Sequence, residues 1–108
     1  MAAFAAAERG SMLTSKQRSY LRSLANTMPS LFQVGKGGVG ETVCRQFDEV
    51  LEVRELIKGN VLNNSLYTAR EAAEEIAAAI GADVVSVIGN RFVLYRRSKE
   101  NPVLVLPS

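Results

Sequence analysis

The fold is decided by residues 31–40, which read LFQVGKGGVG. The apolar run at 31–34 predicts a short β-strand, and the glycines after it predict a tight loop. An amphipathic helix is predicted next, over 41–54. Its apolar residues recur at helical spacing and are Val43, Cys44, Phe47, Val50 and Leu51. A strand that passes through a glycine loop directly into a helix is typical of α/β proteins.

Two further helices are predicted, one on each side of this unit. A helix over 14–28 opens with Thr14 and Gln17, which have the spacing of a capping box. A helix over 68–80 opens with the same spacing, from Thr68 to Glu71. In the first helix the basic residues fall outside the apolar stripe, so we expect them to face solvent.

Three more strands complete the expected fold. One covers 56–62, and two β-branched and aromatic runs cover 83–88 and 91–97. Gly89-Asn90 joins the last two as a two-residue hairpin turn. The element order α-β-α-β-α-β-β predicts a single compact α/β domain with a four-stranded mixed sheet.

Composition excludes much familiar chemistry. The chain has 108 residues, no histidine and one cysteine, Cys44. Ser-His-Asp and Cys-His catalytic sets, histidine zinc sites and internal disulfides are therefore absent. We predict that the protein is not an enzyme, binds no cofactor or metal, and uses Cys44 as a small core residue. Tyr20 and Tyr95 could stack on bases, but packing is the favoured role for both.

The first eleven residues differ from the rest of the chain. They are rich in alanine and end in Gly10-Ser11 before a second methionine, Met12. We interpret 1–11 as a disordered expression leader and 12–108 as the domain. No export signal or apolar run of about 18 residues is present, so we expect a cytoplasmic protein without a membrane span.

Charge is distributed unevenly along the chain. Residues 12–40 hold four basic residues and no acidic ones, whereas 41–83 hold four basic and nine acidic residues. Residues 84–108 are basic again, with four cations and one acid. If the two basic ends meet in space, they form a positive face suited to phosphate groups.

The glycine loop allows several interpretations. Gly35, Gly37 and Gly40 match the dinucleotide pattern GxGxxG, but Asn63 and Asn64 stand where that motif places an acidic residue. A phosphate-loop hydrolase is disfavoured, because no lysine follows the last glycine. A purely structural turn is the plain alternative. The remaining interpretation is a GxxG loop that clamps an RNA backbone, as in KH domains.

Four separated blocks resemble the YhbY family in order and spacing. They are TSKQR at 14–18, VGKGGV at 34–39, ELIK at 55–58 and VIGNRFVLYR at 87–96. This family comprises stand-alone bacterial CRM (chloroplast RNA splicing and ribosome maturation) domains. The resemblance implies a fold similar to the C-terminal domain of translation initiation factor 3. It also implies a monomeric RNA-binding protein associated with precursors of the large (50S) ribosomal subunit, with no small-molecule substrate.

The candidate RNA-binding residues come from this resemblance and from the two basic segments. They are Gly35, Lys36, Gly37, Gly38, Lys16, Arg18, Arg22, Lys58, Arg91 and Arg96. Gly40 departs from the family, which usually has threonine there, and Gly59-Asn60 replaces the usual Val-Lys.

Two alternatives to RNA binding stay open from the residues alone. One is a small nucleotide-binding protein that uses the glycine loop. The other is a protein-interaction domain whose acidic helix contacts a partner through Asp48, Glu49, Glu52 and Glu55.

Overall fold

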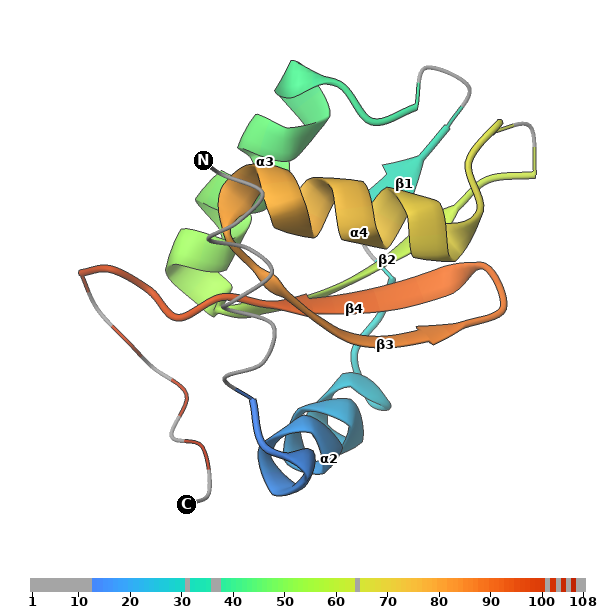
Figure 1. Cartoon of the computed structure of the whole chain (residues 1–108). Coiled ribbons are helices and arrows are strands. Elements are labelled where there is room, and N and C mark those ends of the chain that lie inside the picture. The colour runs from blue at the N-terminus through green and yellow to red at the C-terminus, as the bar shows by residue number, and fades with distance from the viewer. Residues whose placement is uncertain are drawn as a thin grey trace.

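The computed structural model describes residues 13–30, 32–35, 38–63, 65–100, 102, 104 and 106. The leader predicted at 1–11 lies outside these residues. The elements are α2 (Ser15–Ala25), β1 (Phe32–Val34), α3 (Glu41–Arg54), β2 (Leu56–Val61), α4 (Ala69–Ile80), β3 (Asp83–Ile88) and β4 (Arg91–Tyr95) (Figure 1).

The sheet has four strands in the order β1-β2-β4-β3. β1 is parallel to β2, while β4 is antiparallel to both β2 and β3. The predicted α/β domain with a mixed four-stranded sheet is therefore confirmed, as is the final hairpin. The β3–β4 turn and the ends of β1 and β2 lie at one end of the sheet, and β4 ends at the opposite end (Figure 1).

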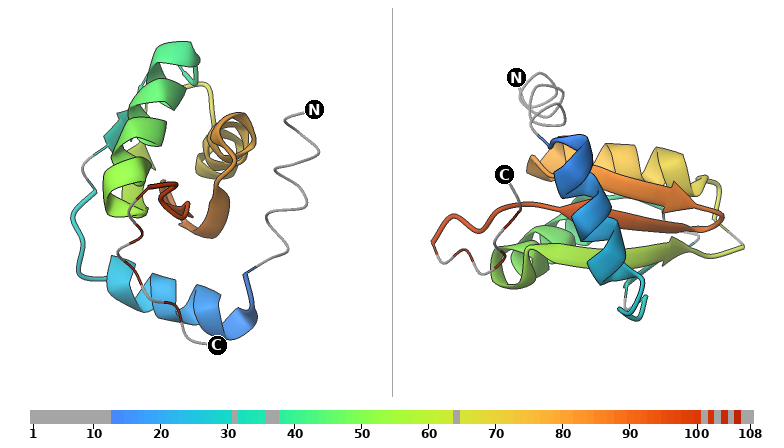
Figure 2. Two further views of the ribbon diagram at one scale, coloured as in Figure 1. Left: turned by 90° about the vertical axis from the view of Figure 1, so that its left-hand side faces the viewer. Right: turned by 90° about the horizontal axis from the view of Figure 1, so that it is seen from below.

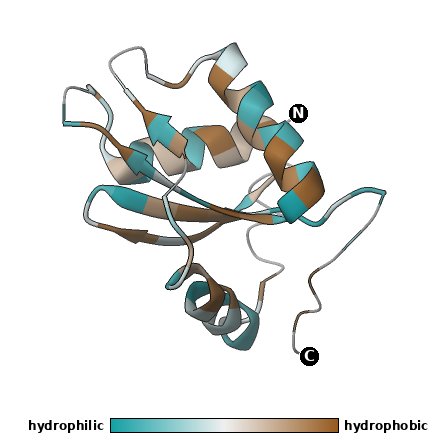
Figure 3. Cartoon of the chain, turned by 180° about the vertical axis from the view of Figure 1, so that it is seen from behind, coloured by the Kyte–Doolittle hydropathy of each residue, from teal (hydrophilic) through white to brown (hydrophobic). Residues whose placement is uncertain are grey.

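Helices cover both faces of the sheet. α3 and α4 lie on one face and α2 lies on the other (Figure 2). Each face has its own hydrophobic cluster: Phe47, Ile76 and Phe92 belong to the α3/α4 cluster. Leu21 and Val93 belong to the α2 cluster. The largely hydrophobic strands β3 and β4 lie between these helix layers (Figure 3).

Both predicted capping boxes form. The Thr14 hydroxyl accepts from the Gln17 N–H at 3.1 Å, and the Thr68 hydroxyl accepts from the Glu71 N–H at 3.1 Å. By contrast α3 begins at Gly40, which offers no side chain to the helix, as its sequence indicated.

Two predicted elements extend too far. The first helix ends at Ala25 rather than at residue 28, and the following residues form a turn. β4 ends at Tyr95 rather than at residue 97. Tyr95 pairs with the first residue of β2 and the first residue of β3, so no partner strand continues beyond it.

Glycine in β2 makes room for an aromatic ring. A Cβ atom at Gly59 would lie 2.9 Å from the Phe92 ring and 3.2 Å from the Phe32 carbonyl oxygen. A larger residue at Gly59 would therefore require the Phe92 ring or the β1 backbone to shift.

None of the helices in the described part of the chain is long and apolar enough to cross a membrane.

Candidate nucleic-acid interface

The described residues of the glycine loop form a closed turn after β1. The Gly38 N–H donates to the Gly35 carbonyl at 3.0 Å. Gly38 has a φ of +72°, a left-handed conformation that favours glycine. Lys36 and Gly37 lie outside the described residues. The prediction that they bind RNA therefore rests only on their place in the GxxG motif.

Tyr67 holds this loop, and the sequence reasoning missed it. A Cβ at Gly38 would lie 2.6 Å from a Tyr67 ring carbon, so the ring packs directly on Gly38. A hydrogen bond with the Glu75 carboxylate raises the pKa of the Tyr67 hydroxyl above its ordinary value, while a bond with the Val39 backbone lowers it. Tyr67 therefore links the loop to α4. No motif identifies this tyrosine, because it is 29 positions from Gly38 in the chain.

Three of the predicted site residues line one cavity on the α2 side of the sheet. This cavity of about 340 Å³ lies between the C-terminal part of α2 and strands β2, β4 and β3. Arg22, Lys58 and Arg91 line it, and we call it the basic cavity. The other described lining residues are Ala25, Asn26, Ser86, Ile88 and Val93, and none of them carries a carboxylate.

Strand register explains this grouping. Lys58 pairs with Val93, and Asn60 pairs with Arg91, so these four side chains share the α2 side of the sheet. The Lys58 ammonium donates to the Ala25 carbonyl at 3.1 Å and to the Met28 carbonyl at 3.3 Å. It therefore joins β2 to the end of α2, where the helix dipole favours a cation.

Arg22 and Arg91 are more available than Lys58. Both are exposed, and Arg22 donates to the Ser19 hydroxyl at 3.3 Å. Within the described ranges neither arginine forms an ion pair. The cations of the opposite face differ, because Arg45 pairs with Glu41 at 3.3 Å and Arg70 pairs with Glu74 at 3.4 Å.

The glycine loop and the basic cavity lie at the same end of the sheet. Gln33 pairs with Asn60, which pairs with Arg91 on its other side. Neighbouring strands are about 4.8 Å apart, so the backbones at Gln33 and Arg91 are separated by roughly 10 Å. Gly35 follows Gln33 by two residues, so one extended ligand could contact both features.

Sequence comparison agrees with the blocks identified above. Residues 13–96 match the CRS1 / YhbY (CRM) domain. The chain belongs to this family. The predicted family resemblance is thereby confirmed over most of the chain.

Relatives of this CRM domain are named for RNA binding. The chain is 46% identical over 96 residues to the probable RNA-binding protein YqeI of Bacillus subtilis, covering 89% of this chain and 100% of that protein. It is 38% identical over 98 residues to the probable RNA-binding protein MJ0652 of Methanocaldococcus jannaschii, covering 89% and 72%. The fold matches the solution structure of hypothetical protein SAV1595 from Staphylococcus aureus. That match has a TM-score of 0.65 and 45% identity, and it covers 89% of this chain and 100% of the other.

We predicted that Arg18 of the CRM domain faces solvent, and this prediction is wrong. It is partly buried, and its guanidinium donates to the Val84 carbonyl and, at 3.5 Å, to the Val85 carbonyl. A β-bulge interrupts β3 between Val84 and Ser86. Arg18 therefore ties α2 to the bulged backbone, since bulges leave ladder groups unpaired. The apolar stripe alone could not reveal this contact, because it depends on carbonyl groups 66 residues away.

Lys16 is exposed at the start of α2, as predicted. Tyr20 is 37% exposed and belongs to neither core cluster, so the packing predicted for it is wrong. Tyr95 is buried in the α2 cluster, as expected. Cys44 packs against the α3/α4 cluster, and burial followed by the charge of Glu75 raises its thiol pKa.

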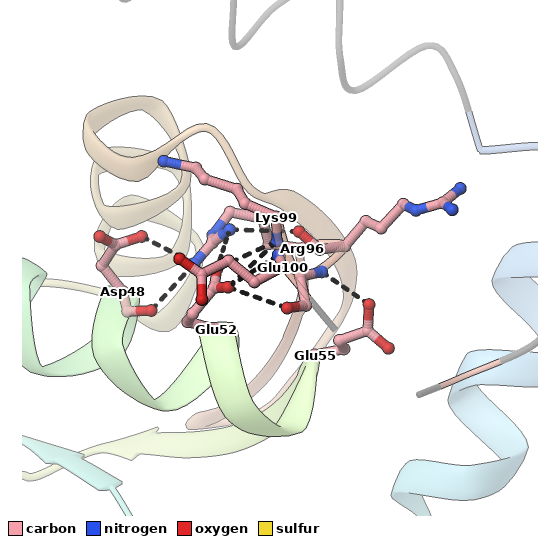
Figure 4. A network of polar contacts seen from close by, with 8 residues as sticks. Asp48, Glu52, Glu55, Arg96, Lys99 and Glu100 are labelled. Carbon is pink, nitrogen blue, oxygen red and sulfur yellow. Dashed lines mark hydrogen bonds and ion pairs between the residues drawn. The ribbon is translucent and has the colours of Figure 1, made fainter. Parts of the chain in front are cut away.

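Arg96 directly follows β4 and is not among the described residues that line the basic cavity. Figure 4 shows it among the carboxylates of α3. Its side chain is only 6% exposed and pairs with Asp48 and Glu52, each at 3.1 Å. It also donates to the Asp48 carbonyl at 3.0 Å. The structure thus places the buried Arg96 side chain in an ion-pair network, whereas the sequence analysis grouped it with the candidate RNA-binding residues. We do not include it in the proposed RNA surface.

The same network includes acidic residues of α3, the helix suggested above as a contact for a protein partner. Glu52 accepts from the backbone N–H groups of Lys99 and Glu100, each at 3.2 Å, and from the Ser98 hydroxyl at 2.9 Å. These bonds, led by the one from Lys99, lower the pKa of Glu52 to about 2. Glu52 thereby fastens the segment that follows β4 onto α3.

Glu55 fastens the next part of that segment. It is fully buried and ends α3 in a left-handed conformation, with a φ of 66°. Its carboxylate accepts from the Ser98 N–H at 2.6 Å and from the Leu104 N–H at 2.7 Å. Asp48, Glu52 and Glu55 therefore have partners within the molecule, which engages three of the four acidic residues suggested for a protein partner.

No cluster of three or more potential metal ligands occurs among the residues with described positions.

Proposed function

We propose that this protein binds RNA through the α2 side of its sheet and the glycine loop. Its ligand is ribosomal RNA during assembly of the large (50S) subunit. The protein acts in the cytoplasm as a monomer, without catalysing a reaction and without a membrane or small-molecule partner. Lys16, Arg22, Lys58 and Arg91 supply positive charge, while the GxxG motif at 35–38 supplies close backbone contact.

One observation carries the proposal: three basic residues group around one cavity on the α2 side, whereas two arginines on the opposite face are held in ion pairs. On the α3/α4 face Arg45 and Arg70 are each paired with a carboxylate of the same helix. On the α2 side Arg22, Lys58 and Arg91 surround a cavity whose described lining residues include no carboxylate. Unpaired cations beside a concave surface attract polyanions and are the expected footprint of a nucleic-acid site.

The glycine loop adds a different kind of contact. Gly35 is half-buried, and its turn brings the backbone close to any ligand at this end of the sheet. Lys36 within the loop would add a charge beside a bound phosphate. Contacts of this kind read RNA backbone and shape rather than base sequence.

Charge reversal tests the surface. Arg91→Glu reverses the charge of an exposed residue that lines the basic cavity. Arg70→Glu makes the same change on α4, which covers the opposite face of the sheet. With a structured ribosomal RNA fragment in a filter-binding assay, Arg91→Glu should weaken binding strongly and Arg70→Glu should change it little. Equal affinities for the folded Arg91→Glu protein and its parent would contradict the proposed surface.

Crosslinking in cells tests the identity of the RNA. The bound RNA, recovered with the full chain and sequenced, should map to precursors of large-subunit ribosomal RNA. The protein should also sediment with immature large-subunit particles in a sucrose gradient. Recovery of unrelated RNAs, with no enrichment of ribosomal RNA, would contradict the ribosomal assignment but not RNA binding.

A further inference from the structure

The basic cavity combines a cationic rim with an apolar floor. Ala25 of α2 and Val93 of β4 are buried and form its inner wall. Arg22 and Arg91 are exposed at its edge. Its volume of about 340 Å³ lies at the lower end of the range typical of small-ligand pockets, roughly 300–1,000 Å³. A flat array of phosphates needs only the cations and not this apolar depth.

Neutral polar groups and one exposed apolar side chain complete the lining. Ser86 contributes a hydroxyl and Asn26 contributes an amide. Ile88 is 72% exposed and places an apolar side chain at the edge of the cavity. An exposed apolar group beside hydrogen-bonding groups suits the face and edge of a planar polar ring.

The β-bulge turns these side chains into the cavity. Val84 and Val87 pack against the α3/α4 cluster, whereas Val85 packs against the α2 cluster. Strict alternation would place Ser86 and Ile88 on the same face as Val84. The extra residue at Val85 shifts the alternation, so that both line the cavity on the α2 side.

We propose that the basic cavity receives one unpaired nucleotide of a bound RNA. Its base lies against Val93 and Ile88, and its phosphate lies beside Arg22 and Arg91. A nucleotide joins an anion to a flat ring with a polar edge, which matches this combination of cations, apolar wall and neutral donors. The proposal rests on the proposed RNA-binding function and makes it more specific. Bases in duplex RNA are stacked inside the helix, so the cavity selects single-stranded or bulged RNA.

The test compares two oligomers that differ only in their bases. One is a uridine oligomer of about 12 nucleotides, and the other is the abasic oligomer of the same length and phosphate count. Binding of the full chain is measured by fluorescence anisotropy. The parent protein should bind the uridine oligomer about fivefold more tightly, the gain expected when the base and the cavity wall together remove about 40 Å² of apolar surface from water.

Ile88→Ala isolates the contact with the base. This substitution removes an exposed apolar group, changes no charge and spares the core. It should abolish the fivefold preference while leaving affinity for the abasic oligomer unchanged. The matched control is Val53→Ala, an equally exposed (70%) aliphatic residue on α3, which should leave both affinities unchanged.

Arg91→Gln separates the two proposals. It should weaken binding of both oligomers alike, because it removes a phosphate contact. If the parent binds both oligomers equally and Arg91→Gln weakens both, the nucleotide site is wrong and RNA binding stands. If neither oligomer nor structured RNA binds, both proposals fail together.

Free uridine monophosphate tests the source of the nucleotide. It should bind at least a hundredfold more weakly than the oligomer, because it gains nothing from neighbouring phosphate contacts. Equal affinity would identify a site for free nucleotides and overturn the proposal.

Discussion

Alanine at Gly38 should destabilise the protein strongly, for two reasons visible in the structure. Gly38 has a φ of +72°, which costs an alanine about 1–2 kcal/mol. The new Cβ would also lie 2.6 Å from the Tyr67 ring, and overpacking of this kind costs about 1–3 kcal/mol. Some relief comes from movement of the ring, so we expect a loss of about 2–4 kcal/mol in the free energy of unfolding.

Thermal unfolding followed by circular dichroism measures this loss. For a domain of this size about 4–8 °C of Tm corresponds to 1 kcal/mol, so Gly38→Ala should lower Tm by at least about 8 °C. Gly35→Ala is the matched control in the same turn. Its Cβ would meet only Leu62 at 3.5 Å, an ordinary contact, so stability should change by less than about 1 kcal/mol. Gly35→Ala should instead weaken RNA binding, because it blocks close approach of the backbone.

A double-mutant cycle identifies the cause. If the Tyr67 ring produces the clash, Tyr67→Ala should cost less stability in the Gly38→Ala protein than in the parent. The reasoning is refuted if Gly38→Ala unfolds at the parent temperature. It is also refuted in part if the two substitutions add without coupling, because the backbone conformation alone would then explain the loss.

Three further predictions concern other parts of the molecule. Gly40→Ser supplies the missing helix cap at a position where a Cβ meets nothing within 4 Å, so urea unfolding should show a gain of about 0.5–1 kcal/mol; a loss would contradict the open geometry. The pKa of Glu52 is lowered from 4.5 to about 2, so its stabilisation is present above pH 4.5 and is lost as pH falls toward 2. The Tm of Glu52→Gln should therefore depend less on pH over that interval than the Tm of the parent, and parallel curves would contradict the assignment. RNA affinity should fall with log salt at a slope of roughly −3 to −4 for about five phosphate contacts, and Arg91→Gln should reduce the slope by about 0.7; a flat dependence would contradict electrostatic binding.

Local signals were sufficient to predict the order of elements. Capping boxes, helical spacing and the Gly89-Asn90 turn act over a few residues, and each formed where the sequence placed it. Element ends were harder, because they depend on partners. β4 ends at Tyr95 because both neighbouring strands begin there, which no property of residues 96–97 indicates.

The candidate site was predictable in part. The sequence identified Arg22, Lys58 and Arg91 as basic, but only strand register shows that they surround one cavity. The bulge in β3 left no recognisable signal, since Val-Val-Ser-Val-Ile reads as an ordinary alternating strand. Tyr67 was missed for the same reason, because its role depends on the packing of distant segments.

The two ends of the sheet differ in the surroundings of their arginines, as Arg91 and Arg96 show. Arg91 and Arg96 are both basic residues at the ends of β4, five positions apart. Arg91 is exposed beside Ile88, while Arg96 is enclosed by Asp48 and Glu52 with the chain segment that follows it. The Arg96 side chain is 6% exposed and contacts two carboxylates, so a phosphate could reach it only if these contacts were broken. We therefore exclude Arg96 from the proposed RNA surface, which is centred on the glycine loop and the basic cavity. The other end secures the C-terminal segment to α3, so loss of Arg96 acts on stability before it acts on binding.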